Sequence, residues 1–216
     1  HTTSGDVTGR KSGYIVGYGS VVFYKENQEM GEGEKKVGVE LGLSKEDKKT
    51  LIEIARYCRR LGAAVVVLPH EIEYDPASRD DRYLCRLLVA ALTDETDIAA
   101  VTTMESARLL KSVIGRLDLL IGSRYHSIVA SLSMRVPCVV LGWSHKYDEL
   151  MGLVGLERYV LSYEQLEQVK INELIHQAWE QRRTLRQQLY RRLPPVEKSV
   201  DELFDQVARR LGFPPA

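Results

Sequence analysis

The sequence predicts an α/β protein with a doubly wound parallel sheet. Short apolar runs alternate with helical patterns between residues 37 and 161, and the links between them are short. The run AAVVVL at 63–68 is apolar without alternation, which is typical of a parallel strand that is buried on both faces. Two strand-to-helix turns follow each other within residues 117–150, so two helix N-termini are expected at one edge of the sheet.

The first half of the sheet is predicted from three strand-helix pairs and a fourth strand. Ser44, with Asp47 three residues later, resembles a capping box, apolar residues then recur at helical spacing, and Gly62 ends the helix. We therefore expect strands at 37–41, 63–68, 97–102 and 118–121, with helices at about 44–61, 79–92 and 106–114.

The second half is predicted to hold two more strands and a helical C-terminal end. We expect its elements in this order: a helix at 127–134, a strand at 138–141, a strand at 159–161, a helix from about 162 and a long helix at 171–193. Pro194 and Pro195 lack the N–H groups that a helix interior needs, so we expect them to end the long helix. A separate amphipathic helix is expected at 199–211.

The composition is that of a globular protein with a core. Apolar residues make up 44% of the 216, and Lys plus Arg equals Asp plus Glu at 30 each. With no net charge there is no global attraction to nucleic acid, so any anion binding must come from local placement. No apolar run approaches the roughly 20 residues of a membrane span and no signal peptide is recognisable, so we expect a cytoplasmic protein.

The three cysteines predict neither disulfides nor a metal centre. Cys58, Cys85 and Cys138 are far apart, and each lies in an apolar stretch. Buried thiols in a reducing compartment are the expected outcome. No Cys/His cluster has the spacing of zinc ligands, so we expect no metal.

Charged and titratable side chains gather in the two strand-to-helix turns. These residues are Arg124, His126, Ser144, His145 and Lys146. Open α/β sheets bind ligands at this edge, where helix N-termini attract anions. We therefore predict an anion site with Arg124 and Lys146 as its cations and His126 as its titratable group.

The region around these turns carries a family motif. It reads GSRYHSIVASLSMRVPCVVLGWSHKYDELMGLVGL at 122–156. An Arg-aromatic-His triplet opens a helix and is followed by a proline-led strand, a lysine and a short helix that ends near Gly-Leu, at Arg124, Tyr125, His126, Pro137, Lys146, Gly155 and Leu156. This pattern resembles the signature of the polysaccharide pyruvyl transferases.

The likeness continues more weakly back to about residue 37. The stretch PHEIEYDPASRDD at 69–81 is similar to a loop of that family, with Asp80 and Asp81 at its acidic pair. One position departs from the family pattern. The family usually carries an arginine near the end of the first strand of this domain, where this chain reads VGVELGLS with Glu40.

The resemblance implies a GT-B-like enzyme with two Rossmann-like domains, of which this chain matches the C-terminal one. We expect residues 37–161 to form a Rossmann-like donor-binding domain and residues 162–216 to be helices that pack on or beside it. Residues 1–36 would be a linker or the remnant of a missing N-terminal domain, since the chain begins with His1 in mid-pattern. The missing domain or an oligomer would complete the site.

The resemblance also implies a chemistry. Such a transferase moves pyruvate from phosphoenolpyruvate to a pair of sugar hydroxyls as a cyclic ketal, in cell-surface polysaccharide synthesis and without a cofactor. His126 would be the acid or a phosphate ligand, with Arg124 and Lys146 as clamps for the donor. Ser144 and His145 would add hydrogen bonds. The acceptor would be a sugar or a lipid-linked saccharide, so peripheral association with the inner face of the membrane is compatible with this function.

Two other functions stay open at this point. A GT-B glycosyltransferase or epimerase half would bind a nucleotide sugar at the same edge, with Glu149 as a candidate for contacting the ribose. A non-catalytic binding domain is the other alternative, and the departure at Glu40 favours it.

Several charged residues are expected to have simple structural roles. Asp80 and Asp81 would stabilise the N-terminus of a helix through its dipole. His70 and Glu71 end a strand on the same edge and would be loop residues that cap a helix, although a buried carboxylate there could also have a raised pKa and act as a base. The arginines of the long helix would form a solvated face, at Arg182, Arg183, Arg186, Arg191 and Arg192.

Overall fold

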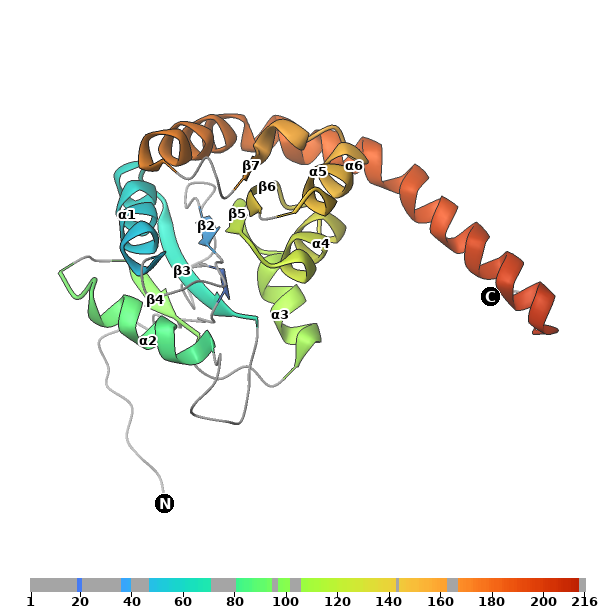
Figure 1. Cartoon of the computed structure of the whole chain (residues 1–216), viewed down its shortest axis with the longest axis horizontal. Coiled ribbons are helices and arrows are strands. Elements are labelled where there is room, and N and C mark those ends of the chain that lie inside the picture. The colour runs from blue at the N-terminus through green and yellow to red at the C-terminus, as the bar shows by residue number, and fades with distance from the viewer. Residues whose placement is uncertain are drawn as a thin grey trace, which may run out of the picture.

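The computed structural model describes residues 19–20, 36–39, 47–70, 81–94, 97–101, 106–142, 144–162 and 167–213. These residues form a mixed α/β structure in which helices lie on both sides of a parallel sheet (Figure 1). The predicted α/β class is therefore confirmed.

The sheet has a strand order that reverses direction in its middle. Six parallel strands lie in the order β4-β3-β2-β5-β6-β7, and β1 pairs antiparallel with the end of β3. The chain leaves β2 through β3 to β4, and then returns to the other side of β2 with β5. The strands are β1 (Gly19–Ser20), β2 (Lys36–Val39), β3 (Ala64–Pro69), β4 (Ile98–Ala100), β5 (Leu119–Gly122), β6 (Cys138–Gly142) and β7 (Val160–Ser162).

The helices are divided between the two faces of the sheet. In Figure 1, α1 (Asp47–Arg60) and α2 (Asp81–Ala90) lie on one side, and α3 (Ala107–Ile114), α4 (Tyr125–Ser133) and α5 (Lys146–Gly152) lie on the other. A 3₁₀ turn covers Glu157–Tyr159 before β7. The last helix, α6 (Gln168–Leu211), crosses one end of the sheet, contacts α1 and α4, and then leaves the body.

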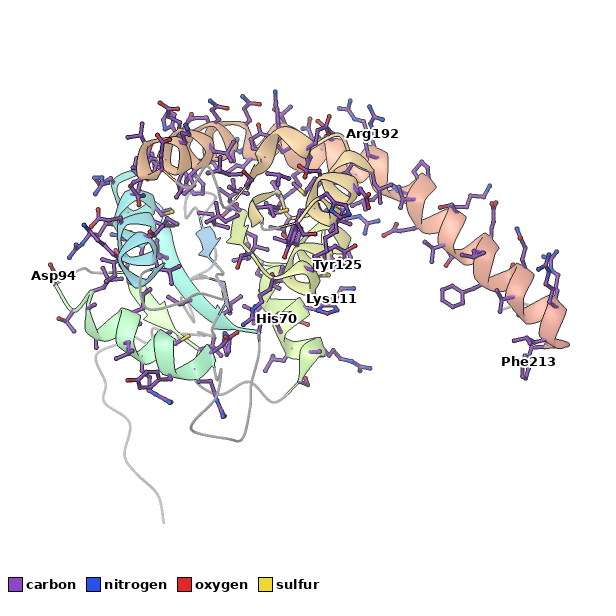
Figure 2. The ribbon with its side chains drawn as sticks, in the orientation of Figure 1. His70, Asp94, Lys111, Tyr125, Arg192 and Phe213 are labelled. Atoms are coloured by element: carbon purple, nitrogen blue, oxygen red, sulfur yellow. The ribbon has the colours of Figure 1, made fainter. Side chains whose placement is uncertain are left out.

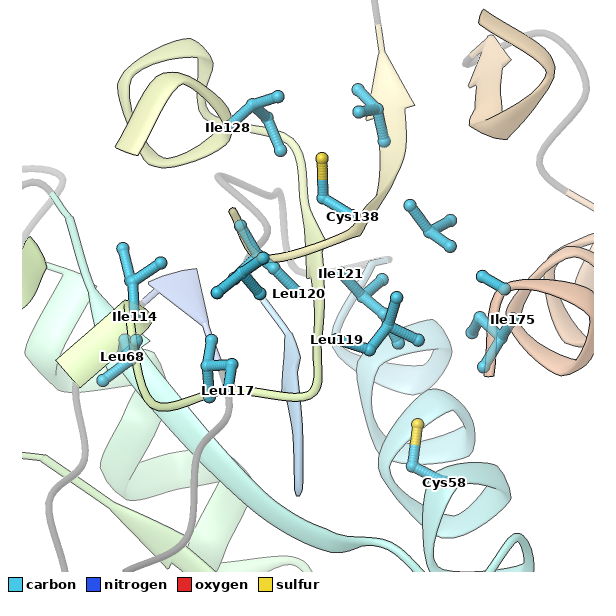
Figure 3. Packing of buried hydrophobic residues seen from close by; sticks show 14 of the residues in the cluster. Cys58, Leu68, Ile114, Leu117, Leu119, Leu120, Ile121, Ile128, Cys138 and Ile175 are labelled. Atoms are coloured by element: carbon cyan, nitrogen blue, oxygen red, sulfur yellow. The ribbon is translucent and has the colours of Figure 1, made fainter. Parts of the chain in front are cut away.

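The core lies where the parallel strands meet these helices. Five of the six residues of β3 are buried, which confirms the prediction of a buried strand from its continuous apolar run. Every residue of β5 and β6 is buried as well. Successive side chains point to opposite faces. Figure 3 shows Leu119 on the side of Ile175 and Cys58, and Leu120 on the side of Ile114.

All three cysteines are buried and none is in a disulfide, as predicted. Burial raises the pKa of the Cys58 thiol to about 12, and burial likewise raises the pKa of the Cys138 thiol to about 12. Both groups are therefore protonated at neutral pH, and a protonated thiol is a poor nucleophile and a poor metal ligand.

The helix ends follow the expected local chemistry. Ser106 caps α3, because its hydroxyl accepts a hydrogen bond from the Leu109 N–H at 3.2 Å. Gly62 follows α1 with a φ of 75°, a conformation that glycine adopts without strain. Helix α4 starts at Tyr125, two residues earlier than predicted, so the aromatic and His126 belong to its first turn. The predicted cap Ser44 lies outside the described residues.

The prediction for the C-terminal helices was wrong in two places: Ser162 belongs to β7 rather than to a helix, and the two prolines do not end the long helix. Instead of ending at Pro194-Pro195, α6 is one helix of 44 residues that contains both prolines. A proline leaves the carbonyl four residues earlier without its helical donor, here the carbonyls of Tyr190 and Arg191. Both prolines and both of these residues are exposed, so water can serve the two carbonyls and the helix continues.

The predicted solvated arginine face is only partly correct. Arg183, Arg191 and Arg192 are exposed, but Arg182 is buried with its guanidinium 4.2 Å from the centre of the Trp179 ring. Arg186 donates a hydrogen bond to the carbonyl of Leu117, next to β5. Sequence periodicity alone does not show that a long arginine stem can cover apolar surface in this way.

Candidate functional site

One buried carboxylate joins the C-terminal ends of two strands. Asp81 is the first residue of α2 and is 3% exposed. Its Oδ1 accepts a hydrogen bond from Nη2 of Arg124 at 3.0 Å, and its Oδ2 accepts one from the backbone N–H of His70 at 3.2 Å. Because His70 follows β3 and Arg124 follows β5, Asp81 bridges the edge of the sheet across the end of β2, where the strand order reverses.

The position of Arg124 is fixed by the start of α4. Arg124 is the N-cap residue, and its carbonyl accepts the N–H groups of Ser127 at 3.1 Å and Ile128 at 3.2 Å. The Ser127 hydroxyl donates to the same carbonyl at 2.8 Å. With the backbone held in this way, the half-buried side chain reaches back to Asp81. A guanidinium carries five donors in a rigid fork, which suits bidentate contact with phosphate or carboxylate.

Two histidines face each other at this edge. His126, in the first turn of α4, is exposed, and its ring lies parallel to that of His70 with 6.0 Å between centroids and 9° between planes. Tyr125 meets His126 edge to face at 6.2 Å. Figure 2 shows His70 at the end of β3 and Tyr125 at the start of α4. His126 therefore combines an accessible ring with a place at a helix N-terminus.

The side chain of Lys146 is half-buried and packs against aromatic rings. Its Nζ is 5.1 Å from the centre of the Tyr125 ring and 5.4 Å from that of Tyr147. Tyr147 is buried, and its hydroxyl donates to the carbonyl of Ser123. These contacts fix the start of α5 against the start of α4. They bring the ammonium of Lys146 to the face of Tyr125, the residue that separates Arg124 from His126.

Comparison with protein families assigns the chain. A family model described as polysaccharide pyruvyl transferase matches residues 31–145, which is more than half of the chain. The chain belongs to the polysaccharide pyruvyl transferase family. This membership confirms the resemblance seen in the sequence and implies a transferase of polysaccharide synthesis that acts on a polysaccharide acceptor. Neither the curated proteins nor the solved structures gave a match.

The matched region of this pyruvyl transferase family member contains most of the site. It includes His70, Asp81, Arg124 and His126, and it ends one residue before Lys146. The strand-to-helix turn in the sequence predicts Arg124 and His126 as site residues. Local sequence patterns predict only structural roles for His70 and Asp81, although both lie at the same edge of the sheet as Arg124. The contact that joins Asp81 to Arg124 spans 43 positions, so no local pattern reports it.

Ser144 and His145 occupy the turn between β6 and α5, as predicted. Within the described residues their contacts are backbone ones: the Ser144 carbonyl accepts the N–H of Tyr147 and the His145 carbonyl accepts that of Glu149, both at 3.1 Å. Their side-chain roles stay predictions. The described residues do not include Glu40, Glu71 and Asp80, the other residues named from the sequence.

In the part of the chain that the structure describes, no group of three or more His, Cys, Asp and Glu residues is placed to hold a metal ion. Among the helices of the same part, none combines the length and the apolarity that crossing a membrane requires.

Proposed function

We propose that this chain is the donor-binding part of a pyruvyl transferase that moves the pyruvyl group of phosphoenolpyruvate onto two hydroxyls of a sugar. The observation that carries the proposal is the Asp81–Arg124 pair beside the exposed ring of His126. This arrangement sets a cation, a titratable group and the N-terminus of α4 at one edge of the sheet. The sugar or lipid-linked saccharide acceptor would come from polysaccharide synthesis, in keeping with the family.

The donor has two anionic groups, and the site has two cations to receive them. Arg124 can form paired hydrogen bonds with a carboxylate or a phosphate, and its carboxylate partner Asp81 keeps its fork in one orientation. Lys146 supplies a compact charge beside Tyr125. Helix α4 adds its positive dipole end. Together they would hold the carboxylate and the departing phosphate.

The chemical step needs a proton at carbon. His126 would deliver a proton to the methylene carbon of phosphoenolpyruvate, which leaves a cationic centre at the neighbouring carbon. A sugar hydroxyl attacks that centre and loses its proton, and the phosphate then leaves with the electrons of its C–O bond. The second hydroxyl closes the ketal and loses its proton. The products are the ketal and inorganic phosphate. Of the two protons that the hydroxyls release, one would return to the ring of His126 and the other would go to the departing phosphate.

The strand order supports a Rossmann-like, GT-B-type half as the framework. With β2 as the first parallel strand, the order β4-β3-β2-β5-β6-β7 is that of the dinucleotide-binding folds. Such sheets bind ligands where the order reverses, which is where Asp81 reaches Arg124. A second domain would present the acceptor. Three buried thiols outside disulfides support a reducing, cytoplasmic setting.

The proposal is tested by calorimetric titration of phosphoenolpyruvate and, separately, of a nucleotide sugar into the chain. We expect saturable binding of phosphoenolpyruvate that Arg124→Ala weakens roughly 10-fold or more, because a charge-assisted bond is lost. The matched control Arg183→Ala removes an exposed arginine of α6 and should bind as the wild type does. Binding of the nucleotide sugar alone would replace this proposal with a glycosyltransferase half. Binding of neither ligand would favour a non-catalytic domain.

The role of His126 is tested by turnover, measured as phosphate release in the presence of a saccharide acceptor and, where needed, of the acceptor domain. His126→Ala should lower kcat by about 10²–10⁴-fold while phosphoenolpyruvate still binds, since proton transfer contributes to that extent. His176→Ala, at an exposed histidine of α6 that is not assigned to the site, is the control and should turn over as the wild type does. Wild-type turnover in the His126 variant would remove this residue from the mechanism.

A further inference from the structure

His70 places a second imidazole at the edge of the sheet where His126 lies. It directly follows β3 and is half-buried, whereas His126 is exposed in the first turn of α4 (Figure 2). The two rings are parallel within 9°, with 6.0 Å between their centroids. They follow β3 and β5, the two strands that lie on either side of β2. The reaction proposed above uses only one of these two rings.

The backbone contacts that hold His70 in place do not use its ring. The His70 N–H donates to Oδ2 of Asp81 at 3.2 Å, and the other oxygen of Asp81 holds Arg124. Pro69, the preceding residue, ends β3 and pairs with Gly19 of β1. Because these contacts involve backbone atoms of the strand end, they do not depend on an imidazole at this position. They nevertheless fix the place from which the ring of His70 extends.

The proposed reaction requires an acid and a base in the same site. The methylene carbon of phosphoenolpyruvate must receive a proton, and the hydroxyl that captures the cationic centre must lose one. A single imidazole cannot be protonated and neutral at the same time. An acid and a base that contact neighbouring atoms of one small substrate, each at about 3 Å, are separated by a distance of the order found between His126 and His70.

Charge and burial indicate which ring is the base. Two protonated rings at this distance would repel each other, so a state with one protonated and one neutral ring is favoured. Burial disfavours a charged imidazole, and His70 is more buried than His126. The described residues also bring to this edge the Asp81–Arg124 pair, whose charges offset each other, and the ammonium of Lys146. His70 is therefore the ring that suits the neutral state.

We propose that His70 is a second catalytic residue, the base for the first sugar hydroxyl, an assignment that rests on the proposed function. His126 gives its proton to the methylene carbon. The first hydroxyl oxygen bonds to the cationic centre and its proton passes to His70. The protonated ring of His70 gives this proton to the phosphate, which leaves with the electrons of its C–O bond. The second hydroxyl closes the ketal and its proton returns to His126, so both rings end as they began.

The test compares phosphate release with deuterium exchange at the methylene carbon of phosphoenolpyruvate in D2O, on the full chain and, where needed, with the acceptor domain. The acceptor is the methyl hexoside on which the wild type releases phosphate fastest. His70→Gln keeps the backbone contact with Asp81 but cannot carry a proton. It should lower phosphate release about 10²–10⁴-fold. Binding of phosphoenolpyruvate and deuterium exchange should persist, because His126 still protonates the carbon and the uncaptured cation loses a hydrogen again.

Two further variants serve as controls for this comparison. His126→Gln should lose exchange and phosphate release together, because the acid itself is removed. His176→Gln, at an exposed histidine of α6, should behave as the wild type does. Wild-type phosphate release in His70→Gln, or a loss of exchange in parallel with phosphate release, would overturn the assignment of His70 and leave the proposed function standing. A wild type that neither binds phosphoenolpyruvate nor exchanges its methylene hydrogens would overturn both.

Discussion

The candidate site has two sides that are held together by different physics. On the ion-pair side, the nearly buried carboxylate of Asp81 joins Arg124 to the end of β3. On the aromatic side, Lys146 lies over the rings of Tyr125 and Tyr147, whose hydroxyl is bonded to the carbonyl of Ser123. The first side depends on a complete charge pair, whereas the second depends on several weaker contacts.

This difference predicts different tolerance to change. Removing one partner of a buried ion pair leaves the other charge without its compensation, so the loss exceeds what the pair contributed. Cation–π and ring contacts are graded, and each contributes little alone. A single substitution should therefore lower the free energy of unfolding more on the ion-pair side than on the aromatic side. The following three substitutions test this contrast.

The largest effect on stability is expected for Asp81→Ala. It should lower the free energy of unfolding by about 2–4 kcal/mol, because Arg124 and the His70 N–H both lose their acceptor. The value stays below that of a fully buried pair because the Arg124 side chain is 29% exposed. Urea denaturation measures it. Asp94→Ala, at a carboxylate that is 72% exposed, is the control and should change stability by less than about 0.5 kcal/mol. If the two variants unfold at the same urea concentration, the buried Asp81–Arg124 pair is no more important for stability than an exposed carboxylate.

A smaller effect is expected for Tyr147→Phe on the aromatic side. The ring keeps its packing, but the carbonyl of Ser123 loses the hydroxyl donor in a buried place. We expect a loss of about 1–2 kcal/mol of unfolding free energy. Tyr190→Phe removes a hydroxyl from a tyrosine that is 61% exposed and should be neutral in the same denaturation experiment. If Tyr147→Phe lowers the free energy of unfolding as much as Asp81→Ala does, the two sides of the site do not differ in their tolerance to substitution.

The smallest effect on stability is expected for Lys146→Met, which keeps the length of the side chain and removes its charge. The cation–π contacts should be worth no more than about 1 kcal/mol at this half-buried place. Affinity for phosphoenolpyruvate should nevertheless fall, because one of the two cations is lost. Thermal unfolding and calorimetry on the same samples separate the two effects, with Lys111→Met as the exposed control. Unchanged affinity would remove Lys146 from the proposed site.

Much of the fold could be predicted because its signals are local. Continuous apolar runs gave β3, β5 and β6, and the strand-to-helix turn gave the place of Arg124 and His126. The role of Asp81 could not be found in this way. An acidic residue that begins a helix is explained locally by the helix dipole, and its partner lies 43 positions away. The continuity of α6 was missed because the rule that a proline ends a helix takes no account of whether water can reach the two freed carbonyls, which are exposed here.

The buried thiols can report on local opening of the structure through their reaction with a thiol reagent. Cys58 lies on helix α1 and Cys138 at the start of strand β6, so they report on different elements of the molecule. A thiol reagent requires thiolate, and with a pKa of about 12 neither group supplies it until the surrounding structure opens. The rate of labelling at each cysteine therefore measures how often its own part of the molecule opens. Ligand added during such an experiment would show which part it holds closed.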